Sequence, residues 1–79
     1  MTKEFAESLF DKIKKEKVLK DINFQMKPFI QSGSLILYTE WINDRQLKVF
    51  IELIQENNVR AYLRPVPYKI EYTLNYNGK

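Results

Sequence analysis

The chain has 79 residues and a formal net charge of +3, from 13 basic and 10 acidic side chains. It contains no cysteine and no histidine, which excludes disulfides, thiol chemistry, histidine-based triads and the usual zinc sites. Its two glycines, Gly33 and Gly78, are too few and too far apart for a phosphate-binding loop. We therefore expect one small domain, residues 1–79, that is not an enzyme and holds no metal or other cofactor.

The first predicted element is a helix over Lys3–Lys15. Thr2 precedes it as a candidate cap, and lysines follow the apolar residues, as suits the carbonyl end of a helix. The apolar residues recur at helical spacing and form one stripe, Phe5, Ala6, Leu9, Phe10 and Ile13.

Two strands are predicted next, over Ile22–Lys27 and Leu35–Ile42. In the first, apolar and polar residues alternate, which is typical of a half-buried strand. Pro28 ends this pattern, and the stretch around Gly33 indicates a turn. The second strand is apolar on both faces, which predicts a central position in the sheet.

The segment after Ile42 has two interpretations. A helix near Arg45–Glu56 agrees with a polar cap at Asn43 or Asp44 and with apolar residues at helical spacing. A strand over Leu47–Leu53 agrees with the alternation of apolar residues and with the β-branched residues there. We favour the helix because of its length and its cap.

Two further strands, Val59–Arg64 and Lys69–Tyr76, follow from strict alternation, with Pro65 ending the first. The fold class is therefore α+β, an antiparallel sheet of about four strands with one or two helices packed on one face. The alternative is one helix on a longer antiparallel meander. The predicted core comprises Phe10, Ile13, Leu37, Phe50, Ile51 and Ile70.

Two stretches of the chain also resemble each other in sequence. Asp21–Pro28 matches Asn58–Pro65 when the final prolines are aligned, and each stretch precedes a strand with a Tyr-Thr pair. The pairs are Tyr38–Thr39 and Tyr72–Thr73. Two helix–strand–strand units would explain this pattern. The simpler explanation is that any two strands preceded by polar turns look this similar.

Because histidine and cysteine are absent and no carboxylates stand at a recognisable catalytic spacing, binding to another protein is the favoured function. Aromatic residues exceed what a thin core requires, and tyrosine and tryptophan are common at binding hot spots. The candidate residues are Tyr62, Tyr72, Tyr76 and Trp41. The frequent asparagine, lysine and isoleucine suit a phage or another mobile element, so we expect a regulator or inhibitor of a host protein. Self-association is a further way to stabilise so small a domain.

Nucleic-acid binding is the alternative function. Basic residues cluster near the end of the first helix and recur on a later strand, and phosphate contacts need such cations. The candidates are Lys14, Lys15, Lys17, Lys20, Arg60 and Arg64. Acidic residues interrupt the lysine cluster, and no known nucleic-acid-binding signature is present.

The sequence has neither an apolar run of membrane-spanning length nor the apolar core of a secretory signal. We therefore expect a cytoplasmic protein that does not contact a membrane.

Overall fold

The computed structural model describes residues 2–27 and 33–76. It confirms the α+β class, with an antiparallel sheet of four strands and two α-helices. The elements in chain order are α1 (Lys3–Lys15), a short 3-10 turn η1 (Lys17–Leu19), β1 (Gln25–Met26), β2 (Leu35–Thr39), α2 (Asp44–Glu56), β3 (Val59–Val66) and β4 (Lys69–Tyr76). Neither helix in these two ranges has the length and apolar character needed to cross a membrane.

Side chains cap both helices at their first turns. Thr2 accepts a hydrogen bond from the Phe5 backbone N–H at 3.1 Å. At the start of α2, Asn43 and Gln46 each bond the other's backbone N–H, at 2.8 and 3.0 Å, so two donors without helical partners are satisfied. The strand interpretation of Leu47–Leu53, and with it the longer meander, is therefore wrong.

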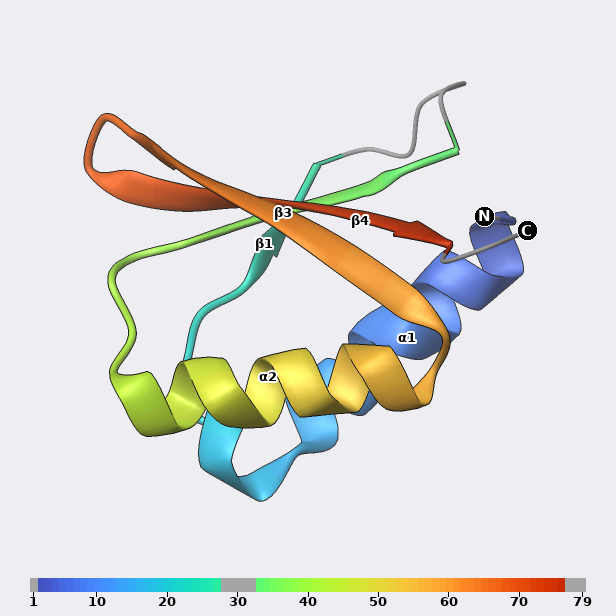
Figure 1. The fold of residues 1–79 in the computed structure, drawn as a ribbon, viewed down its shortest axis with the longest axis horizontal. Helices are drawn as coiled ribbons and strands as arrows, with labels where there is room; N and C mark the ends of the chain where they lie inside the picture. The colour runs from blue at the N-terminus through green and yellow to red at the C-terminus, as the bar shows by residue number, and fades with distance from the viewer. Residues whose placement is uncertain (1, 28–32, 77–79) are drawn as a thin grey trace.

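The sheet has the order β1-β2-β4-β3, so β2 and β4 are central and β1 and β3 lie at its edges. Both helices pack on the same face of this sheet, which gives two layers (Figure 1). The central position predicted for the strand beginning at Leu35 is confirmed. It ends at Thr39 rather than Ile42, because the chain bends at Glu40 to enter α2.

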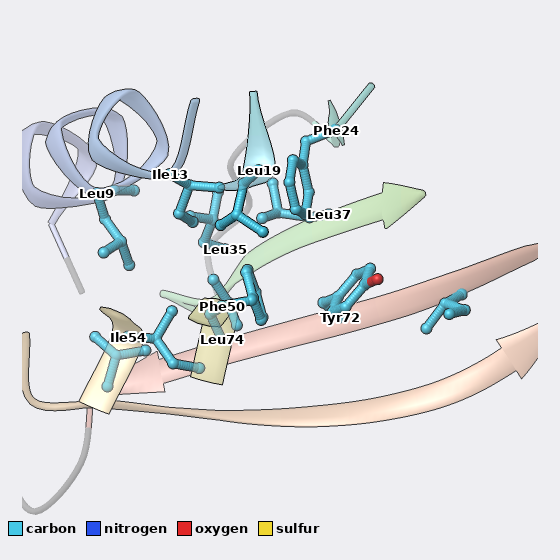
Figure 2. Close-up of a cluster of buried hydrophobic side chains, with 13 residues drawn as sticks. Leu9, Ile13, Leu19, Phe24, Leu35, Leu37, Phe50, Ile54, Tyr72 and Leu74 are labelled. Carbon is cyan, nitrogen blue, oxygen red and sulfur yellow. The ribbon is translucent and has the colours of Figure 1, made fainter. Parts of the chain in front are cut away.

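The core lies between the helices and the sheet. Figure 2 shows side chains from both helices, η1, β2 and β4 converging there. Phe50 is the centre of an aromatic cluster, with ring centroids 5.6 Å from Phe24 and 5.0 Å from Tyr72. The predicted burial is confirmed for Ile13, Leu37, Phe50 and Ile70. It is wrong for Phe10 and Ile51, which are half-buried at the margins of their helical stripes.

The first predicted strand is much shorter than Ile22–Lys27. Only Gln25 and Met26 pair as a strand, with Tyr38 and Leu37. The backbone before them is turned, because the Ile22 N–H bonds the Leu19 carbonyl and the Phe24 N–H bonds the Ile22 carbonyl. The predicted limit at Pro28 lies outside the described residues.

The helix–strand–strand order occurs twice in the structure, and the strand registers bear on the proposed matches between the two units. Met26 pairs with Leu37 in the first unit, and Leu63 pairs with Tyr72 in the second. Aligning the prolines makes Met26 and Leu63 equivalent, and each of them lies opposite a buried residue of a central strand. The match of Tyr38 with Tyr72 is wrong, because they point to opposite faces of the sheet.

Candidate functional site

One face of the sheet has no helix on it. Along β2 and β4, the buried residues alternate with residues that point away from the helices. The register brings this second set together with its counterparts on β1 and β3. We call this surface the open face, and its main side chains are Lys27, Ile36, Tyr38, Arg60, Tyr62, Arg64, Lys69, Glu71 and Thr73.

Three side chains of the open face form a hydrogen-bonded chain across the central strands. Tyr38, Glu71 and Arg64 lie opposite one another on β2, β4 and β3. The Tyr38 hydroxyl donates to one carboxylate oxygen of Glu71 at 2.8 Å, and the Arg64 Nε donates to the other at 2.6 Å. Both oxygens of Glu71 are therefore engaged, and its charge is compensated by Arg64.

The electrostatics of this chain keep Glu71 ionised. The hydrogen bond from Tyr38, followed by that from Arg64, holds the pKa of the Glu71 carboxyl below its usual range. The same bond to Glu71 raises the pKa of the Tyr38 hydroxyl, so Tyr38 remains the donor. Arg64 is mostly exposed, with 71% of its side chain accessible against 13% for Glu71. Glu71 therefore fixes the Arg64 guanidinium through its Nε, and most of the Arg64 side chain remains accessible to a ligand.

A second ordered pair lies further along β3. The guanidinium carbon of Arg60 is 5.7 Å from the ring centroid of Tyr62, within the range of a cation–π contact. Because side chains alternate along a strand, Arg60, Tyr62 and Arg64 share one face, and all three are exposed. They form a row of cation, aromatic ring and cation on an edge strand.

The open face has an excess of positive charge. Lys27, Arg60, Arg64 and Lys69 contribute four cations, whereas Glu71 is the one carboxylate among the open-face residues. Lys69 donates a hydrogen bond to Gln25 across the face, and Lys27 contributes to the lowered pKa of Glu71. This surface suits a ligand with negative charge.

The tyrosine and tryptophan candidates do not form one surface. Tyr62, 56% exposed, lies on the open face. Tyr72 is fully buried beneath the helices, so its choice as a surface residue is wrong. Tyr76 packs its ring 4.8 Å from that of Phe5 at the end of α1, and Trp41 lies in the bend after β2, 74% exposed. The four residues predicted to contact a partner therefore do not form one interaction surface.

The basic candidates also divide into two groups. Arg60 and Arg64 lie on the open face, whereas Lys14, Lys15, Lys17 and Lys20 lie at the end of α1 and around η1. This segment lies on the helix side of the molecule (Figure 1). Lys15 pairs with Asp11 at 3.0 Å, and the Lys14 ammonium lies 5.3 Å from the Phe10 ring. One continuous basic surface is therefore not formed.

Tyr38 was not among the candidate residues chosen from the sequence. Its neighbours Leu37 and Thr39 are buried, so Tyr38 points to the opposite face. Lys69 was likewise missed, although it precedes the buried Ile70 by one position. Tyr38 was hidden because its strand is apolar on both faces, and the sequence does not say which of them the helices cover. Lys69 could have been found, because the alternation of β4 places it on the polar side of that strand.

A polar cleft of about 340 Å³ lies where the ends of β1 and β2 meet the first turn of α2. Its lining includes Asp21, Glu40, Trp41 and Gln46. The Gln46 side chain is already used in the helix cap. In the described ranges, no cluster of three or more acidic side chains is placed to hold a metal ion.

Comparison with models of known protein families finds no match, and no curated protein matches the chain in sequence.

Proposed function

We propose that this protein is a non-enzymatic binding module that engages an acidic surface of a partner protein through its open face. One observation supports this most directly: Arg60, Tyr62 and Arg64 are exposed side by side on the edge strand β3. Arginine and tyrosine are over-represented among the residues that contribute most to protein interfaces. Carboxylates of the partner would pair with the guanidinium groups of Arg60 and Arg64. Another side chain of the partner would pack on the Tyr62 ring between them.

The ordering of these side chains favours binding. Glu71 holds the Arg64 guanidinium, and the Tyr62 ring supports that of Arg60. A side chain that is already ordered loses less conformational entropy when a partner immobilises it. The open face therefore has the charge and the preorganisation that an acidic protein surface would require.

The cellular role remains a prediction from the sequence. We extend the proposal to a cytoplasmic regulator or inhibitor of a host protein, encoded by a phage or another mobile element. The composition of the chain supports this extension, and the fold neither adds to it nor contradicts it.

The test compares Tyr62→Ala with Tyr68→Ala, a control that removes an exposed tyrosine of the turn between β3 and β4. Each tagged protein is used to retrieve partners from nuclease-treated lysate of the source cell. We expect wild type and Tyr68→Ala to retain the same protein and Tyr62→Ala to lose it. Titration of that purified protein should then show a loss of at least ~2 kcal/mol in binding free energy for Tyr62→Ala. Normal binding by Tyr62→Ala would reject the proposal.

Single-stranded nucleic acid is the second candidate ligand, favoured by the four cations that surround Tyr38 and Tyr62 on one face. Cations neutralise phosphates, and exposed rings stack on unpaired bases. Replacing Arg60 and Arg64 together by glutamine should then lower the salt slope of binding by about two. Replacing Lys14 and Lys17 together by glutamine is the matched control, because both lysines lie on the helix side. Weak salt dependence, unchanged in the arginine variant, would remove this candidate.

A further inference from the structure

The outer edge of β3 is unpaired in the described sheet. This strand, Val59–Val66, pairs with β4 alone. Val66 and Lys69 flank a two-residue turn and face each other, which makes them a hydrogen-bonded pair. The alternation of an antiparallel ladder then directs the backbone N–H and C=O groups of Ala61 and Leu63 away from β4. Pro65 occupies the next outward position, where it has no N–H to offer.

From this edge we infer that the partner adds an extended acidic segment to the sheet, as an antiparallel strand alongside β3. This inference rests on the proposed function and specifies how the partner binds. The backbone of the added strand would bond Ala61 and Leu63, which supplies affinity without reading side chains. Side chains that alternate along the added strand would supply the specificity.

The residues of β3 define the pattern of the added strand. Directly opposite residues share a face, so carboxylates opposite Arg60 and Arg64 would lie on the open face, with a third residue opposite Tyr62. The two residues between them would lie opposite Ala61 and Leu63, toward the core side. Leu63 is 38% exposed there, so this side accepts apolar residues. The recognised pattern is therefore acidic, apolar, any residue, apolar, acidic.

A second copy of this chain is the competing occupant, and its charge disfavours it. Pairing Ala61 with Ala61 of another copy would engage the same outward groups. It would also make the two Arg60 side chains diagonal neighbours, ~7–8 Å apart, and join two faces that each have an excess of cations. An acidic strand satisfies the same backbone groups and neutralises Arg60 and Arg64.

The test uses three capped peptides and the full chain. The probe is Ser-Glu-Val-Thr-Val-Glu-Ser, and the composition-matched control is Ser-Val-Glu-Thr-Glu-Val-Ser, which moves the carboxylates to the core side. The third peptide is the probe with both valine nitrogens methylated, which keeps its charges but removes the two donors of the ladder. We expect the probe to bind at least tenfold more tightly than either of the others.

Amide exchange locates the peptide. With the probe at saturation, the amides of Ala61 and Leu63 should exchange more slowly, whereas that of Tyr62, already directed at β4, should change little. Equal binding of the probe and its methylated form, or no slowing at Ala61 and Leu63, would overturn the inference. So would no detectable binding of the probe at millimolar concentration. Slow exchange of both amides in a dimer of the protein alone would assign the edge to a second copy and overturn it as well.

The two proposals fail in distinguishable ways. If Tyr62→Ala still binds the cellular partner, the open face is not the binding surface and the proposed function is rejected. If Tyr62→Ala loses the partner but methylation of the peptide has no effect, the open face binds without strand addition. Only the inference about β3 is then wrong.

Discussion

The hydroxyl oxygens of Thr39 and Tyr72 lie 2.6 Å apart inside the core and join β2 to β4. Thr39 also donates to the carbonyl oxygen of Glu40, at 2.7 Å. A threonine hydroxyl has one proton, so Tyr72 must be the donor in the bond between the two side chains. Burial raises the pKa of Tyr72, which keeps this donor protonated.

This assignment predicts unequal effects of removing the two hydroxyls. Thr39→Val deprives the buried Tyr72 hydroxyl of its acceptor, which should cost roughly 1–3 kcal/mol of unfolding free energy. Tyr72→Phe removes the hydroxyl itself and should cost less. The double variant has neither hydroxyl, so none is left buried without a partner. Its loss of unfolding free energy should therefore be smaller than the sum of the two single losses. Urea unfolding of the four proteins measures this, and additive costs would contradict the pairing.

The chain Tyr38–Glu71–Arg64 predicts a pH dependence of stability. The pKa of Glu71 is lowered in the folded state from 4.5, so the unfolded chain takes up this proton first as the pH falls. The contribution of Glu71 is therefore complete above the unfolded pKa and is lost as the pH falls through the lower folded pKa. Urea unfolding from pH 7 to pH 3 should show this loss in wild type.

Two variants test the assignment to Glu71. Glu71→Gln should be less stable than wild type at pH 7 and should show a flatter decline below pH 4.5. Glu52→Gln, at an exposed position of α2, is the matched control and should decline as wild type does. Parallel profiles for Glu71→Gln and wild type would show that other groups determine the acid sensitivity.

Phe50 should be among the least replaceable side chains. It is fully buried and contacts the rings of Phe24 and Tyr72. Phe50→Ala should cost roughly 3–5 kcal/mol, which approaches the whole stability of many small domains. Phe10→Ala, at a half-buried position of α1, removes the same atoms and should cost clearly less. Thermal melting compares them, and similar losses would contradict the packing described.

Tyr68 is in a backbone conformation that suits tyrosine poorly. Its φ is 66°, in the left-handed region, and its side chain is 92% exposed. Asparagine tolerates this region better, as at Asn58, where φ is 60°. Tyr68→Asn should therefore stabilise the protein by up to ~1 kcal/mol, whereas Asn58→Ala should destabilise it. Unfolding free energies from urea titration check both signs, and a destabilised Tyr68→Asn would show that the ring makes a stabilising contact.

The sequence predicted the helices and β4 well because their signals are local. Asn43 and Gln46 lie three positions apart in the cap of α2, and the alternation of β4 is unbroken over its length. The strand over Ile22–Lys27 was overestimated because alternation alone does not reveal that the preceding backbone is turned. Whether Gln25 pairs depends on Tyr38, which is distant in the chain.

The candidate site was less predictable, because it depends on which face the helices cover. Tyr62 and Tyr72 both occur in alternating strands, yet one is exposed and the other buried. The alternation did place Arg60, Tyr62 and Arg64 on one side of their strand, and their role in binding remains a prediction. The contacts of Glu71 with Tyr38 and Arg64 required the register of three strands, which no local pattern specifies.

The sheet order β1-β2-β4-β3 has a consequence for the rate of folding. The β3–β4 hairpin closes through a two-residue turn, whereas Thr39 pairs with Ile70 only when α2 and β3 have been brought into the intervening loop. Closing this long loop costs chain entropy before its contacts form. We therefore expect β2 to join the sheet after the folding transition state, so that Leu37→Ala accelerates unfolding more than it slows folding. Stopped-flow kinetics in urea would measure this partition, and a mainly slower folding rate would place β2 in the folding nucleus instead.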